Sequence, residues 1–152
     1  SEILSYQIYT YIATEGYSGR VVSLHSYGAV TRDIIHRWSY PLVPDVNLFC
    51  DTSYEYFHPG VYKEAGVSLA QSCALGEDAL IGSKSVVGER ASIKNSVIGR
   101  GCTIGAGSVI EGCFIFANVT IGPNCTVTDS VICEDVQLGS DVTVKSNCIL
   151  GG

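Results

Sequence analysis

The second half of the chain carries a strict hydrophobic pattern. Aliphatic side chains recur every six residues, except for three steps of five residues, at Leu69, Leu75, Ile81, Val87, Ile93, Ile98, Ile104, Ile110, Ile115, Ile121, Val127, Ile132, Leu138, Val144 and Leu150. The three short steps are themselves 17 residues apart. Three hexapeptides therefore form one coil, and this repeat predicts a parallel β-helix, which makes the fold mainly β.

Alternation along each predicted strand assigns an inner and an outer face. The residue two places before each aliphatic points inward with it, and these positions hold only Ala, Ser, Cys and Val. Such small side chains suit the narrow interior of a triangular prism. Glycine often follows the aliphatic, where the backbone has to turn a corner.

The first 66 residues follow a different pattern and hold twelve of the fourteen aromatic residues. β-Branched and tyrosine residues predict strands at 7–12 and 20–24. A helical period predicts a helix from Ser26 to about Trp38, ended by the following proline. One face of this helix would present Tyr27, Val30, Ile34 and Trp38. Residues 43–66 contain prolines and many polar side chains, which predict an irregular linker.

These elements divide the chain into three expected parts. Residues 1–42 would be the C-terminal end of an α/β domain, because two strands and one helix are too few for a core of their own. Residues 43–66 would be the linker and residues 67–152 the β-helix. The sequence contains no methionine, even at position 1, so we expect a piece of a longer protein whose β-helix continues further.

The outer face of the predicted β-helix carries the first candidate site. The residue directly before each aliphatic points outward, and the 17-residue repeat stacks these positions into three columns. One of them, here called the apolar column, is apolar throughout: Leu80, Val97, Phe114, Val131 and Ile149. A continuous apolar stripe outside a solenoid is expected to be covered. The cover would be a partner subunit anchored on Phe114, or alternatively the chain's own first domain through the helix that ends at Trp38.

Composition and charge narrow the functional classes. Of the 152 residues 46% are hydrophobic and 16% charged, which is too apolar for a disordered segment. The net charge is −6 and no basic cluster occurs, so a direct nucleic-acid role is not expected. Apolar runs of only a few residues fit no membrane span.

The seven cysteines are interpreted as buried free thiols. Their number is odd and no C-x-x-C pair occurs, which argues against a complete disulfide framework and against zinc. Five of them fall in the inward register: Cys73, Cys102, Cys113, Cys125 and Cys148. Free thiols behave as small hydrophobic groups and indicate a reducing compartment such as the cytosol.

Candidate catalytic groups are sparse. His25, His36 and His58 all precede the repeats, and no histidine occurs from residue 67 to residue 152. Hexapeptide acyltransferases use a histidine base, and hexapeptide carbonic anhydrases bind zinc through histidines, so neither chemistry is expected. No G-x-x-x-x-G-K-[ST] loop is present. We therefore expect no catalytic, cofactor-binding or metal-binding residue in this chain.

One segment resembles a known family. Residues 27–47 are similar to the epsilon subunit of eukaryotic translation initiation factor 2B, through Ala29, Val30, Arg37, Trp38, Tyr40, Pro41, Leu42, Pro44 and Asn47. The hexapeptide segments at 67–69, 81–82, 95–99 and 101–105 continue the likeness in the same order. Physical rules favour right-handed parallel crossovers, so the left hand of the β-helix is taken from this resemblance and from other hexapeptide proteins.

The resemblance also implies a function. That family's epsilon subunit has a nucleotidyltransferase-like domain, then a left-handed β-helix, then a helical domain that releases GDP from initiation factor 2. This chain would be a cytosolic, non-catalytic scaffold region that assembles with the other subunits, particularly the gamma subunit. It would reach initiation factor 2 only through the full-length protein. The alternative is the C-terminal part of a sugar-1-phosphate nucleotidyltransferase, such as a mannose-1-phosphate guanylyltransferase.

Overall fold

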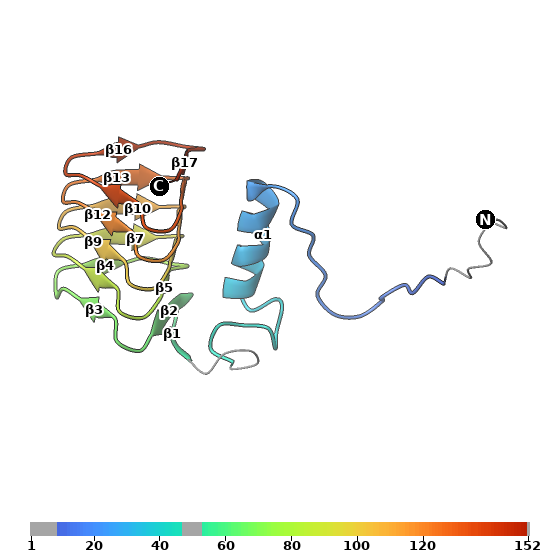
Figure 1. Cartoon of the computed structure of the whole chain (residues 1–152). Helices are drawn as coiled ribbons and strands as arrows, with labels where there is room; N and C mark the ends of the chain where they lie inside the picture. Colours follow the sequence, from blue (N-terminus) through green and yellow to red (C-terminus); the bar gives the residue numbers. More distant parts are fainter. Residues whose placement is uncertain (1–8, 47–52, 152) are drawn as a thin grey trace.

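The computed structural model describes residues 9–46 and 53–151. Most of these residues form a three-sided solenoid of stacked parallel strands, and a single described helix, α1 (Leu24–Ile35), lies beside it (Figure 1). The stacked strands are very short, mostly two or three residues, because the backbone turns a corner after each one. The hexapeptide pattern therefore predicted the architecture correctly.

Three sheets form the sides of the solenoid. Sheet A contains, in spatial order, β1 (Tyr54–Phe57), β2 (Val61–Glu64), β5 (Leu80–Ile81), β8 (Val97–Ile98), β11 (Phe114–Ile115), β14 (Val131–Ile132) and β17 (Ile149–Leu150). Sheet B contains β3 (Ser68–Leu69), β6 (Val86–Val87), β9 (Thr103–Ile104), β12 (Thr120–Ile121) and β15 (Gln137–Leu138). Sheet C contains β4 (Ala74–Leu75), β7 (Ser92–Lys94), β10 (Val109–Glu111), β13 (Thr126–Thr128) and β16 (Thr143–Val144).

The interior of the prism follows the predicted inward register. The aliphatic residues of the central coils are fully buried, as Ile98 and Ile110 illustrate at 0% exposure. Small polar side chains between them bond to the backbone of the next coil. The Ser85 hydroxyl donates to the Gly99 carbonyl at 2.9 Å and accepts from the Cys102 amide at 3.1 Å. Serine is therefore tolerated inside because its hydroxyl always has a partner.

For the described residues the cysteine prediction is confirmed as to free thiols and, for three of them, as to burial, while Cys73, Cys133 and Cys148 are only partly buried. The six described cysteines are all free, and Cys102, Cys113 and Cys125 are buried in the prism. The Cys102 thiol donates to the Phe116 carbonyl at 3.0 Å, in the same manner as the inward serines. Burial raises the pKa of the Cys102 and Cys113 thiols, since a thiolate would be poorly solvated there. Cys50 lies outside the described residues.

The predicted linker at 43–66 is wrong over its second half. β1 and β2 form an antiparallel hairpin, and β2 pairs in parallel with β5, so the solenoid begins before residue 67. Glu64 in β2 is 1% exposed, receives two hydrogen bonds from the Arg100 guanidinium at 2.8 and 2.9 Å and one from the Ser83 amide. This ion pair joins β2 to the two coils above it. Residues 47–52 lie outside the described ranges.

The two strands predicted in the first half are also not observed. Residues 9–12 and 20–23 are without regular structure, and residues 7 and 8 lie outside the described ranges. β-Branched and aromatic composition favours an extended backbone, but a strand also needs a neighbour to accept its hydrogen bonds. In the described part of the chain no strand pairs with either segment.

Helix α1 begins and ends earlier than predicted. Ser23 caps its start, with the Ser23 and Ser26 side chains each bonded to the other's backbone amide. The end is set by Arg37, which adopts a positive φ of 67°. The Arg37 amide donates to the Ile34 carbonyl and the Trp38 amide donates to the Asp33 carbonyl, which is the Schellman pattern. The helix therefore stops before the proline that was expected to end it.

Candidate interaction site between helix α1 and the solenoid

The structure confirms that the predicted apolar column is one continuous stripe on sheet A. Leu80 is the register partner of Val97, Val97 of Phe114, Phe114 of Val131, and Val131 of Ile149. Tyr62 is the register partner of Leu80 and adds a sixth member. Sequence analysis missed Tyr62 because it lies in the segment interpreted as a linker.

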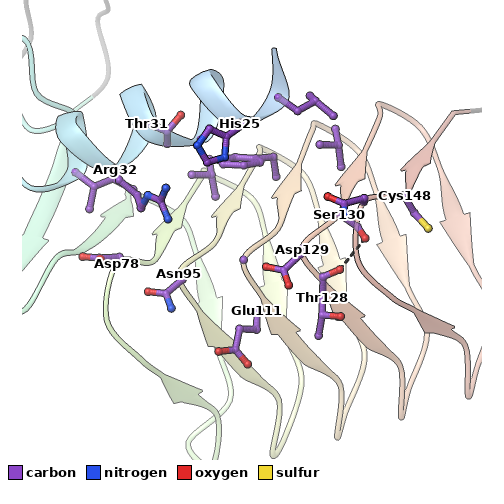
Figure 2. Close-up of a pocket in the computed structure, with 18 residues that line it drawn as sticks. His25, Thr31, Arg32, Asp78, Asn95, Glu111, Thr128, Asp129, Ser130 and Cys148 are labelled. Atoms are coloured by element: carbon purple, nitrogen blue, oxygen red, sulfur yellow. Dashed lines mark hydrogen bonds between the residues drawn. The ribbon is translucent and has the colours of Figure 1, made fainter. Parts of the chain in front are cut away.

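Helix α1 lies along this column, parallel to the direction in which the coils stack (Figures 1 and 2). Near its N-terminal end the Tyr27 ring meets the Phe114 ring edge-on, with centroids 4.9 Å apart. At its C-terminal end the Ile35 carbonyl accepts a hydrogen bond from the Tyr62 hydroxyl at 2.9 Å. The eight helical steps from Tyr27 to Ile35 span about 12 Å. The three coil steps between Tyr62 and Phe114 span about 14 Å, so helix and column match in length.

Of the predicted contact face, Tyr27 does meet the column, but the other contact residues differ. Leu24, Gly28, Thr31 and Ile35 line the boundary with the solenoid. Trp38, predicted on the contact face, lies beyond the helix and is 72% exposed. Val30 packs instead near Gly19 in the segment before the helix. The helix turns Gly28 toward Phe114, and a glycine at the contact is not indicated by a pattern of apolar residues.

The C-terminal end of α1 is held by polar contacts to the solenoid. The His36 imidazole lies 2.8 Å from the Asp78 carboxylate in the turn before β5. Tyr62 is fully buried, and this burial raises the pKa of its hydroxyl. Its ring also packs against Tyr56 of the hairpin at 4.9 Å.

Arg37 extends this junction to the loop that follows the helix. Its guanidinium donates to the Asp45 carboxylate at 2.7 Å, and this hydrogen bond raises the already high pKa of Arg37. The same guanidinium lies over the Tyr56 ring at 5.2 Å, and the neighbouring Tyr62 hydroxyl also raises the pKa of Arg37. The hairpin, the loop and the helix end therefore meet at one arginine.

The rest of the boundary is a cleft rather than a packed interface. Its volume is about 470 Å³, and Figure 2 shows the helix side chains facing the solenoid turns across it. Arg32 and His25 come from α1, Glu111 comes from the end of β10, and Asp78 and Asp129 come from turns. Glu111 already pairs with Lys94 at 3.0 Å, as Asp78 does with His36. The cleft thus carries charges of both signs.

The described residues show no arrangement typical of a metal centre. Within residues 9–46 and 53–151 no three His, Cys, Asp or Glu side chains gather closely enough to hold a metal ion. His25 and His36 lie at opposite ends of α1, and His58 lies in the turn between β1 and β2. The structure therefore does not bring the three histidines together. Over the same ranges no helix is both long and apolar enough to cross a membrane.

Part of the apolar column is already covered by helix α1 and is therefore not open to a partner subunit. Val131 is only 8% exposed beneath α1, and Phe114 is half-buried by Tyr27. The observed cover of these two residues corresponds to the alternative in which the chain itself packs on the column. Ile149 lies at the far end and is 59% exposed. Contact of the column with a partner subunit stays a prediction.

Comparison with known proteins gives consistent results. Residues 58–152 match the family described as the EIF2B subunit epsilon LbH domain, a left-handed β-helix. The translation initiation factor eIF2B subunit epsilon of Dictyostelium discoideum is 39% identical over 82 residues, 54% of this chain and 12% of that protein. The protein of the same name from Schizosaccharomyces pombe is 42% identical over 89 residues, 59% of this chain and 13% of that protein.

Among solved structures, the acetyltransferase domain of PglB from Neisseria gonorrhoeae is 17% identical, with a TM-score of 0.31, over 60% of this chain and 49% of that one. At that score the similarity carries no argument about fold or function. The family match covers more than half of the chain and the whole stack from β2 to β17. This chain, a left-handed β-helix with helix α1 beside it, therefore belongs to the eIF2B epsilon-subunit LbH domain family of translation initiation factors.

Proposed function

We propose that this chain is a non-catalytic scaffold region of the epsilon subunit of the guanine-nucleotide exchange factor for initiation factor 2. It joins other subunits of the complex, particularly the gamma subunit, in the cytosol. The exchange reaction belongs to a separate C-terminal domain of the full-length protein, through which initiation factor 2 is reached. The chain spans only 12–13% of the curated relatives it matches, so these activities are proposed for the whole protein.

The observation that carries this proposal is where the solenoid places its reactive groups. The buried cysteines and serines point into the prism and bond to backbone carbonyls, as Cys102 and Ser85 do. Apolar surface instead runs along the outside of sheet A. A solenoid with bonded groups inside and an apolar stripe outside is suited to binding other protein surfaces rather than to catalysis.

Among the described residues of the apolar column, Ile149 is the one that a partner can reach most readily. Ile149 is 59% exposed, and Leu24 at the start of α1 is 49% exposed. Among the column residues, Leu80, Val97, Phe114 and Val131 are less exposed than Ile149. We therefore propose that the gamma subunit contacts Ile149 first.

Co-purification with the gamma subunit tests this proposal. The change Ile149→Asp places a charge in the proposed contact, and we expect recovery of the gamma subunit to fall at least tenfold. The matched control is Thr143→Asp, an exposed outward position on β16 of sheet C, which should leave recovery unchanged. Equal recovery with both variants, each with an unchanged circular dichroism spectrum, would contradict an interface at Ile149.

A second measurement tests whether the exchange activity lies outside this chain. The chain alone should not accelerate GDP release from initiation factor 2. Acceleration above the spontaneous rate would show that the exchange function lies within these residues and would overturn the scaffold proposal.

A further inference from the structure

Helix α1 is attached to the solenoid unevenly along its length. At its C-terminal end, Tyr62 donates to the Ile35 carbonyl, His36 lies against Asp78 at 2.8 Å, and Arg37 donates to Asp45 at 2.7 Å. These three polar contacts involve three consecutive residues of the helix end. The first two fix the helix to the first coils of sheet A, and the third ties the helix end to the loop that follows it.

The N-terminal half of α1 has much weaker contacts. The edge-on ring contact between Tyr27 and Phe114 is its principal packing interaction in the described residues. Gly28, which follows, has no side chain to add, and the 470 Å³ cleft separates the helix from the turns. Leu24 and His25 at the start of the helix are exposed. Only one of the twelve helix residues, Ile35 at the anchored end, is buried.

The segment before the helix would not hold it down. Tyr17 donates to the Asp33 carboxylate at 2.8 Å, and Gly19 lies against Val30, so this segment packs on the helix itself. Figure 1 shows it running away from the solenoid. It would therefore move together with α1.

We propose that α1 is a hinged cover of the apolar column. It pivots at Ile35–Arg37, and its N-terminal half swings outward to expose Phe114 and Val131. This inference rests on the proposed assembly function, because the exposed residues would continue the surface that a partner subunit meets at Ile149. The closed state then protects the apolar column when no partner is bound.

Thiol labelling of the full chain tests the hinge without any partner. Val131→Cys places a thiol beneath the moving half of α1, and Val127→Cys places a matched thiol inside the prism, where Val127 is 0% exposed. Each variant is treated with N-ethylmaleimide under native conditions, and labelling is read site by site by peptide mass spectrometry. We expect the thiol at position 131 to react at least tenfold faster than the thiol at position 127.

A second change separates opening from global unfolding. Tyr27→Ala removes the ring contact with Phe114, which favours the closed helix. An aromatic pair of this kind shifts an equilibrium by about fivefold, so labelling at position 131 should rise by about that factor. Labelling at position 127 should not change. The exposed Tyr11→Ala serves as the control and should alter neither rate.

Two results would overturn the hinge. One is equal labelling at positions 131 and 127, and the other is an equal effect of Tyr27→Ala on both positions. If Val131→Cys does not fold by circular dichroism, Val97→Cys under the middle of the helix replaces it with the same expectations. A closed helix in this assay would leave the gamma-subunit contact at Ile149 untouched, so the two proposals fail separately.

Discussion

Replacing Tyr62 by Phe removes a single oxygen atom from the junction of helix, loop and hairpin. The hydroxyl donates to the Ile35 carbonyl at 2.9 Å in a side chain that is fully buried. Carbonyls in the last turn of a helix have no partner within the helix, so this one depends on Tyr62. The same hydroxyl also helps to raise the pKa of Arg37.

The loss in the free energy of unfolding follows from the Ile35 carbonyl, which Tyr62→Phe leaves without its hydrogen-bond donor. A buried carbonyl that loses its partner costs about 1–3 kcal/mol. Arg37 adds little to this loss of stability, because its side chain is 33% exposed and keeps its hydrogen bond to Asp45. We therefore expect Tyr62→Phe to lower the free energy of unfolding by about 2 kcal/mol. For a domain of this size that corresponds to a fall in Tm of about 4–8 °C.

Urea and thermal unfolding followed by circular dichroism measure this change. Tyr17→Phe is the matched control, since it removes a hydroxyl whose 2.8 Å bond to Asp33 is exposed to water. The control should lower the free energy of unfolding much less than Tyr62→Phe, because both groups can bond to solvent instead. If the two variants lose the same stability, the buried bond does not hold the helix end and the reasoning is refuted.

Three further changes address the solenoid. Ile110→Ala, at a residue with 0% exposure in a central coil, should cost about 3–4 kcal/mol in urea unfolding, and a loss below 1 kcal/mol would mean the core is loosely packed. Gly105→Ala should prevent soluble expression, because its Cβ would collide with the backbone of the next coil, whereas Gly139→Ala meets open space and should be neutral. Burial raises the pKa of Cys102 and Cys113, so the folded state favours their neutral thiols. The stability contributed by these two thiols should therefore be present below about pH 9 and be lost above it, and Cys102→Ser/Cys113→Ser should flatten that loss in unfolding curves recorded from pH 7 to pH 10.

The sequence predicts the repeating part of the fold well because each coil repeats the same pattern of inward aliphatic, small and turn residues. An aliphatic residue at position Ile98, a small one at Ser96 and a turn before it recur in the next coil, so one register accounts for the whole stack. The first coil departs from that rule. Lys63 stands where other coils have an aliphatic residue, and its ammonium lies 5.3 Å from the Phe57 ring at the end of the prism. An end coil can place a cation there because its inner side is partly open to water, with Lys63 30% exposed.

The interaction site was predicted only in part for a different reason. Outward apolar residues identify the column, since side-chain direction alternates reliably in strands. Which face of α1 meets the column depends on the shape of both surfaces, and Gly28 is accepted beneath Phe114 because it has no side chain. The anchor also depends on Arg37 in a positive-φ conformation usually taken by glycine, which no hydrophobic pattern indicates.

The match between the length of α1 and the height of the column limits how this domain can vary. A solenoid accepts the insertion or deletion of a whole 17-residue coil without disturbing its registers, and many such proteins differ in coil number. Here one additional coil between β5 and β11 would lift Phe114 by about 4.8 Å while Tyr62 stayed in place. Tyr27 and Ile35 could then no longer reach both partners unless the helix gained about three residues. Coil number and helix length in this domain can therefore change only together.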